Sequence, residues 1–381
     1  MATPGSAPVA FASQITLGVN AGTQALLEAM LSYDQQVSDL IFSPGRLPQL
    51  EIHGHLTAME VAGLRPLSAD DTRRIASELI GDNKQAVTVL REYGSCDISY
   101  AVPGLARFRA NIFIQRGSCA IVMRVIPTAI PDFKSLNLPS QLREISNLHD
   151  GIVLVTGARN SGKSSTLAAL LDSINEQHTY HIITIEDPIE FLHNHKRSTI
   201  HQRELHSDAP NFAGALRASM RQAPKVILVG EMRDRETMEM ALEAAETGHI
   251  VLSTLNTMDA AKTIERFVSS FPGNEHSAIR TRLMKTLRYV ISQRLIPRKD
   301  GQGRIAAIEI LKNARHILPL LECEDPSGQN LLDAIKRSAP EGMQHFDGEI
   351  QKLVKAGLVD LETAASYATN PEELRQSVTA R

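Results

Sequence analysis

The chain has 381 residues, of which 43% are hydrophobic and 22% charged, and its formal net charge is −3. This length predicts two or three domains, each large enough to bury a core. The slight negative charge, the lack of tryptophan and an aromatic content of only 4% argue against a protein that binds nucleic acid through a basic, base-stacking surface.

Cysteine usage and the distribution of apolar residues indicate the cellular compartment of the protein. The three cysteines follow no C-x-x-C spacing, which favours a reducing environment over disulfides or a zinc ribbon. No basic residue precedes Arg46, so no secretory signal is predicted, and no apolar run is long enough to span a membrane. The expected location is the cytoplasm, and any action at a membrane would depend on partners.

The first third of the chain predicts a small α+β domain. Residues 1–20 are rich in Ala, Pro, Ser and Gly and predict a flexible tail. Residues 21–126 then show helical stripes and strands with alternating polarity. Two of these strands carry Arg109 and Arg124. Surface positions are the simpler interpretation of both arginines, although a guanidinium can also stabilise a phosphoryl group during its transfer.

The rest of the chain predicts an α/β domain. Three prolines punctuate residues 127–142, which indicates a stiff linker. Apolar strands and helical patterns alternate through residues 143–381, as is typical of a mostly parallel sheet covered by helices on both faces. From about residue 331 to the end only helical patterns remain.

The strongest motif follows the first strand of this α/β domain. Residues 157–164 match the phosphate-binding loop GxxxxGK[ST] between an apolar run and a helical pattern. Its glycines let backbone N–H groups point at phosphate oxygens, and the helix adds the positive end of its dipole. Lys163 is expected to bind the β- and γ-phosphates of ATP, and the Ser164 hydroxyl to bind Mg²⁺. The predicted nucleotide-binding residues are Gly157, Ala158, Arg159, Asn160, Ser161, Gly162, Lys163, Ser164 and Ser165.

Chemically useful side chains flank other predicted strands. Glu186 ends one strand, where a carboxylate can orient and deprotonate water, although a solvated strand end explains it equally well. Glu231 follows an apolar strand in the manner of a Walker B acid, so it is the second predicted magnesium residue, with Ser164. His249 stands alone before a further strand, where a structural role is the simpler interpretation.

Four histidines lie close together in sequence, at His193, His195, His201 and His206. Their spacing fits no compact metal site, and no cysteine or acidic co-ligand stands out. A solvated loop is therefore preferred over a metal site.

Taken together, these motifs resemble the PilT-type retraction ATPases of the type IV pilus, within the secretion ATPase superfamily. The likeness extends from about residue 23 to 375, and it is carried by the phosphate-binding loop, residues 186–191, the LVGEMRD stretch at 228–234 and residues 248–256. It implies a PAS-like N-terminal domain, a RecA-like ATPase domain and a ring-shaped homohexamer with ATP between domains.

The resemblance also implies residue roles and partners. Glu186 matches the catalytic glutamate, Glu231 the Walker B acid, and His249 the first histidine of a His box. Arg109 and Arg124 match arginines that sense the phosphates. The implied activity is ATP hydrolysis that drives pilin extraction and twitching motility at the inner membrane. An inner-membrane platform protein and a paralogous retraction ATPase are the implied partners.

Three departures from the family pattern keep other functions open. Asn256 stands where a histidine is usual, Ala158-Arg159-Asn160 replaces Pro-Thr-Gly, and residues 314–321 match a retraction motif poorly. Asn256 and the altered segment at residues 314–321 favour, as an alternative, an auxiliary PilU-like ring subunit with low ATPase activity. A type II or type IV secretion ATPase is a nearer alternative. The four-cysteine motif of assembly ATPases cannot be formed from three scattered cysteines, which favours retraction over assembly.

Overall fold

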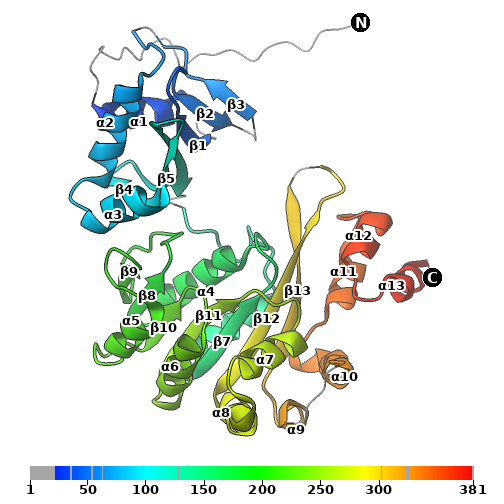
Figure 1. Ribbon diagram of the computed structural model, residues 1–381. Coiled ribbons are helices and arrows are strands. Elements are labelled where there is room, and N and C mark those ends of the chain that lie inside the picture. The colour runs from blue at the N-terminus through cyan, green and yellow to red at the C-terminus, as the bar shows by residue number, and fades with distance from the viewer. Residues whose placement is uncertain are drawn as a thin grey trace, which may run out of the picture. The chain divides into compact units, whose positions relative to one another are not determined.

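The computed structural model describes residues 22–34, 37–52, 55–61, 63–126, 129–301, 303–322 and 327–379. The predicted tail at residues 1–20 and Cys323 lie outside these ranges. The chain divides into two compact units, Met1–Thr128 and Ala129–Arg381, which Figure 1 shows in ribbon form. In the described ranges, no helix combines the length and the apolar character needed to cross a bilayer.

The first unit is built on a six-stranded antiparallel sheet of order β3-β2-β1-β6-β5-β4. Its elements are α1 (Thr23–Tyr33), β1 (Val37–Phe42), β2 (Gln49–Ile52), β3 (His55–Ala58), α2 (Ala69–Ile80), α3 (Lys84–Tyr93), β4 (Ser95–Val102), β5 (Ala106–Gln115) and β6 (Ser118–Ile126). Strand alternation buries one face, with Phe108 and Met123 fully enclosed, and leaves Arg109 and Arg124 on the other. The α+β character predicted from sequence is confirmed.

The second unit contains a seven-stranded sheet of order β13-β12-β7-β11-β10-β8-β9, parallel except for the edge strand β13. Its elements up to that strand are η2 (Ser140–Asn147), β7 (Gly151–Thr156), α4 (Lys163–Gln177), β8 (His181–Glu186), β9 (Thr199–Glu204), α5 (Phe212–Ser219), β10 (Val226–Val229), α6 (Arg235–Glu246), β11 (Ile250–Leu255), α7 (Ala260–Ser269), η3 (Gly273–Glu275), α8 (His276–Thr286), β12 (Leu287–Pro297) and β13 (Arg304–Lys312).

Both faces of this sheet are covered, because its central strands carry mainly apolar side chains on both faces. Every residue of β7, β10 and β11 is buried. Along β7, Ile152 and Leu154 pack into one core with residues of α6 and α8, whereas Val153 and Val155 pack into another with residues of α4. The predicted α/β architecture is confirmed by this arrangement.

The segment predicted as a linker contributes to the second unit. Phe133, Leu138 and Leu142 are buried in the same core as the apolar face of α4. Residues 129–142 therefore do more than connect, because their apolar side chains cover a helix that would otherwise be exposed.

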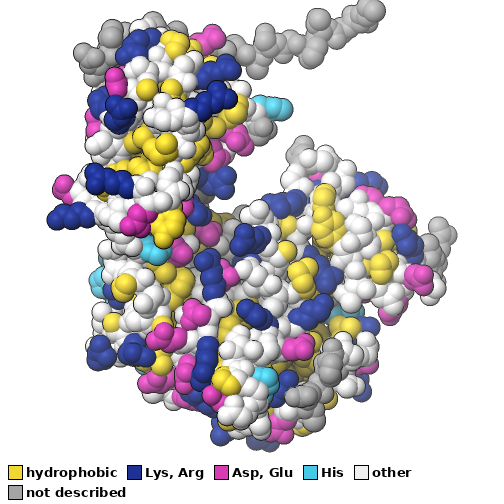
Figure 2. Space-filling view, viewed as in Figure 1, with side chains coloured by type: hydrophobic (Ala, Val, Ile, Leu, Met, Phe, Trp, Pro, Cys, Tyr) yellow, Lys and Arg dark blue, Asp and Glu magenta, His cyan; other side chains and the backbone are white. Residues whose placement is uncertain are grey.

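The chain ends in helices, as the sequence predicts. They are α9 (Leu318–Glu322), α10 (Gln329–Arg337), η4 (Ala339–Glu341), α11 (Phe346–Lys355), α12 (Leu361–Tyr367) and α13 (Pro371–Thr379). Phe346 and Ile350 of α11 pack with Ile296 of β12 and Ile305 of β13 in a separate core. Acidic and basic side chains are interspersed on the face shown in Figure 2.

The edge strand β13 carries a buried carboxyl group. Glu309 on β13 is 3% exposed, and its Oε1 accepts a hydrogen bond of 2.9 Å from the backbone N–H of Ala260, the first residue of α7. Burial raises the pKa of Glu309 to about 7.

This burial predicts that stability falls as pH rises from the ordinary carboxyl pKa of 4.5 toward 7. In that window the folded chain retains a proton that the unfolded chain has released, at a cost of at most about 1.4 kcal/mol per pH unit. Glu309→Gln keeps the accepting oxygen but removes the titration. We therefore expect the variant to gain stability over the wild type between about pH 5 and about pH 8, measured by thermal unfolding. The control is Glu243→Gln, an exposed change on α6. A difference from wild type that is the same at both pH values would contradict the prediction.

Candidate active site

The loop between β7 and α4 is shaped by two glycines. Gly157 has φ of 147°, and a Cβ there would lie 2.4 Å from the backbone oxygen of Gln293 and 2.5 Å from the Ser161 hydroxyl. Gly162 has φ of 86°, and its Cβ would lie 2.8 Å from the side-chain nitrogen of Gln293. At Gly157 both the backbone conformation and the nearby backbone oxygen of β12 exclude a side chain, whereas at Gly162 the positive φ is what favours glycine.

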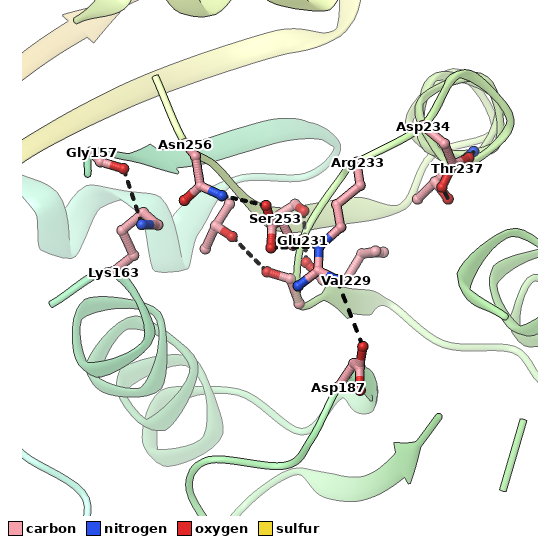
Figure 3. A network of polar contacts seen from close by, with 12 residues as sticks. Gly157, Lys163, Asp187, Val229, Glu231, Arg233, Asp234, Thr237, Ser253 and Asn256 are labelled. Carbon is pink, nitrogen blue, oxygen red and sulfur yellow. Dashed lines mark hydrogen bonds and ion pairs between the residues drawn. The ribbon is translucent and has the colours of Figure 1, made fainter. Parts of the chain in front are cut away.

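Lys163 begins α4 and folds back over this loop. Its Nζ donates to the backbone oxygens of Gly157, at 3.0 Å, and Ala158, at 2.8 Å (Figure 3). Burial lowers the pKa of Lys163, and the nearby carboxylates of Glu231 and Glu190 oppose that effect. The ammonium is thus held within the loop by contacts that a phosphate group could replace.

The composition of the loop fits a bound anion with its magnesium ion. The Ser161 hydroxyl is buried and has no hydrogen-bond partner, which is unusual for a buried polar group. It faces a glycine loop at the amino end of α4, where backbone N–H groups favour negative charge. Ser164, the second residue of α4, and Glu231 offer the oxygen atoms that Mg²⁺ prefers.

Parallel pairing aligns the acids with this loop. Leu255 at the end of β11 pairs with Thr156 at the end of β7, and β10 and β8 continue the sheet beside β11. Glu186, Glu231 and Asn256 therefore lie at or just after the ends of strands that finish at the same edge as the glycine loop. This is the edge at which open α/β sheets bind ligands.

Glu186 is the last residue of β8 and is held by three donors. Its Oε1 accepts from the Thr184 hydroxyl at 2.6 Å and from the Gln202 amide at 3.1 Å. Its Oε2 accepts a longer bond, 3.4 Å, from the backbone N–H of Glu190. Burial raises the pKa of Glu186, and these hydrogen bonds limit the increase. A fixed carboxyl with a raised pKa is suited to general-base chemistry.

Glu231 has both carboxylate oxygens engaged. Asn256 donates its Nδ2 to Oε1, and Arg233 donates its Nε to Oε2 at 2.8 Å. A guanidinium nitrogen of Arg233 also lies 3.9 Å from Asp187 (Figure 3). The Thr254 hydroxyl donates to the backbone oxygen of Gly230 at 2.7 Å, which fixes the turn that carries Glu231 against β11.

One predicted residue of the second unit, His249, lies apart from this group. His249 precedes β11, so it lies at the opposite edge of the sheet, and its Nδ1 is 2.9 Å from the backbone oxygen of Ala244. At about 3.3 Å per strand residue, the six residues of β11 separate it from the loop edge by roughly 20 Å. Arg109 and Arg124 belong to the first unit, where Arg124 pairs with the buried Asp39 at 3.0 Å.

Two of the four clustered histidines, His195 and His201, contact other histidine rings. His181 Nε2 and His201 Nδ1 lie 2.9 Å apart, and the ring of His195 packs edgewise on His201. Burial lowers the pKa of His193 to about 4. Over the described part of the chain, no group of three or more His, Cys, Asp or Glu side chains is arranged to hold a metal ion.

Sequence reasoning missed the residues that support the site. Gln202 lies on β9 and Gln293 on β12, and neither segment was predicted as a strand. Gln293 also accepts a hydrogen bond of 2.8 Å from the Thr166 hydroxyl of α4. The sequence of β9, Thr-Ile-His-Gln-Arg-Glu, has no apolar run, but β12 contains Tyr-Val-Ile and could have been recognised from it.

Comparisons with known proteins agree on one family. Residues 102–349 match the family described as type II/IV secretion system protein. The chain is 41% identical over 341 residues to the type IV pilus retraction ATPase PilT of Pseudomonas aeruginosa, covering 90% of this chain and 97% of that protein. It is 36% identical over 338 residues to the type IV pilus ATPase PilU of the same organism, covering 89% and 87%. The crystal structure of the pilus retraction motor PilT with bound ADP superposes with a TM-score of 0.83 at 40% identity, covering 93% of this chain and 98% of that one.

The steric role of the loop glycines predicts the effect of Gly157→Ala. The added Cβ meets a backbone oxygen and forces an unfavourable φ, so we expect the loop to open and nucleotide affinity to fall about tenfold or more. Calorimetric titration with ATP and Mg²⁺ measures this loss. The matched control is Gly273→Ala, where a Cβ meets nothing within 4 Å. Equal affinities in the two variants would contradict the steric argument.

Proposed function

Because this chain belongs to the type II/IV secretion system protein family, we propose that it is an ATP-hydrolysing motor that drives retraction of a type IV pilus. The observation that carries the proposal is that the glycine loop, Glu186 and Glu231 stand at one edge of the second unit's sheet. The pilus retraction ATPase PilT, a relative similar over nearly its whole length, supports pilus retraction as the output.

The chemistry follows from the residues at that edge. The loop N–H groups and Lys163 bind and orient the phosphates of ATP. Ser164 and Glu231 would hold Mg²⁺, which, when bound, offsets negative charge on the phosphates. Glu186 orients the attacking water, and its Oε2, which accepts only the long bond from Glu190, takes the proton of that water. Thr184 and Gln202 keep Oε1 occupied and so fix which oxygen reacts.

A ring of identical subunits is the proposed working form. In a homohexamer that holds ATP between domains, Arg109 and Arg124 would supply positive charge to the phosphates. Their location supports this role, since they are cross-strand partners on an exposed face of the first unit, 53% and 73% exposed. The other partners we propose are an inner-membrane platform protein and a paralogous retraction ATPase. The proposed location is the cytoplasm, at the periphery of the inner membrane.

A second candidate is an auxiliary, PilU-like subunit of the same machine, with low ATPase activity of its own. Asn256 favours it, because this amide beside Glu231 can donate a hydrogen bond but cannot gain or lose a proton near neutral pH. The 36% identity to PilU also supports it.

A type II or type IV secretion ATPase would use the same site.

The role assigned to Glu186 predicts a separation of binding from hydrolysis. Glu186→Gln keeps the size of the side chain but cannot accept the proton, so we expect phosphate release to fall at least about 100-fold while ATP affinity remains near the wild-type value. Glu236→Gln, an exposed change on α6, is the control and should leave both unchanged. A turnover rate that survives Glu186→Gln would remove the enzymatic proposal.

The output can be tested in cells that carry labelled pili. Deleting the gene should leave extended fibres that no longer shorten, and Glu186→Gln restored in its place should not rescue shortening. Loss of fibres would instead indicate a role in assembly. Retraction that is weakened but not abolished, with low phosphate release from the pure wild-type protein, would favour the auxiliary role.

A further inference from the structure

Arg233 occupies the carboxylate proposed to face the magnesium ion. Its Nε donates to Oε2 of Glu231 at 2.8 Å, while Asn256 fills Oε1. The Glu231 side chain is 22% exposed, so this ion pair lies at the wall of the site, where it is stronger than a fully solvated pair. A cation approaching Glu231 therefore meets a guanidinium already bound there.

Arg233 has a second acceptor within reach. One of its terminal nitrogens lies 3.9 Å from Oδ2 of Asp187, which follows β8 just as Glu231 follows the adjacent strand β10. Asp187 is 31% exposed, and Nε2 of His206 lies 4.0 Å from its Oδ1. The Arg233 side chain is 57% exposed, so few packing contacts oppose its movement between the two acids.

We propose that Arg233 is a resident cation on Glu231 that Mg²⁺ must displace when it binds with nucleotide, and that Asp187 receives the displaced guanidinium. The proposal rests on the proposed function, because it takes Glu231 as the carboxylate that faces Mg²⁺. Arg233 is then a positioning residue that acts through Glu231. It keeps that acid oriented before Mg²⁺ binds, and it raises the Mg²⁺ concentration that nucleotide binding requires.

The ion pair between Arg233 and Glu231 is weak enough for Mg²⁺ to displace the guanidinium. A partly exposed ion pair contributes little, so the competition should change the apparent Mg²⁺ requirement about three- to tenfold, without abolishing binding. Loss of Arg233 removes the competing guanidinium and should lower the Mg²⁺ concentration that nucleotide binding requires. Loss of the Asp187 charge removes the acid that receives the displaced guanidinium and should raise that Mg²⁺ concentration. These opposite directions distinguish exchange between two acids from general weakening of the site.

The experiment measures how much Mg²⁺ gives half-maximal binding of a fluorescent ATP analogue to the full chain. Arg233→Gln should lower this concentration about threefold or more, and Asp187→Asn should raise it. In the double variant, Asp187→Asn should have no further effect, because no guanidinium remains to be received. Arg235→Gln is the matched control, since Arg235 pairs with Glu275 at 2.9 Å, away from the loop. Hydrolysis is not part of the readout.

Each outcome decides something. An unchanged or raised Mg²⁺ requirement in Arg233→Gln overturns the proposal, as does an Asp187→Asn effect that persists in the double variant. Glu231→Gln separates this failure from failure of the proposed function. If Glu231→Gln leaves the Mg²⁺ requirement unchanged, the role of Glu231 fails, whereas if only the Arg233 arm fails, that role stands. Thermal unfolding checks that each variant is folded, and Arg233→Met replaces Arg233→Gln if the latter is not.

Discussion

The parallel pairing of β7, β11, β10 and β8 is the constraint on which the site depends. Parallel strands all end at one edge of the sheet, so a glycine loop after one strand and acids after two others meet there, although they are far apart in sequence. The strands can pair in this way because each is mainly apolar on both faces and must be covered by helices. Burial of these strands thus brings the glycine loop and the two acids together at one edge of the sheet.

Buried and half-buried charges at that edge need partners, and the partners determine what each acid can do. Glu186 receives neutral donors from Thr184 and Gln202, so it is fixed in position without a cation beside it, and burial still raises its pKa. Glu231 receives a guanidinium, which offsets its charge, and a neutral amide from Asn256. Similar side chains at neighbouring strand ends therefore suit different tasks, general base in one case and cation binding in the other.

The strand β12 links this edge to the C-terminal helices. Gln293 faces the glycine loop and Thr166, while the next residue, Arg294, donates to the backbone oxygen of Tyr367 at 2.6 Å and stacks on the ring of Phe346 at 3.7 Å. Adjacent side chains on a strand point to opposite faces, so one short stretch contacts both the loop and the helices. These two residues therefore place the glycine loop and the C-terminal helices in contact with the same stretch of β12.

The amino-acid sequence by itself determined the fold class, the phosphate-binding loop and the acids at the ends of two strands. Each depends on a local pattern of residues, namely apolar runs, fixed glycine spacing and a charge at a strand end. The sequence did not reveal Gln202, Gln293 or Arg233 as partners of the site, the burial of residues 129–142, or the position of His249 at the opposite edge of the sheet. Those features arise from contacts between distant segments, where hydrogen bonding, desolvation and strand register act together. Only the tertiary structure brings such segments close enough for these forces to operate.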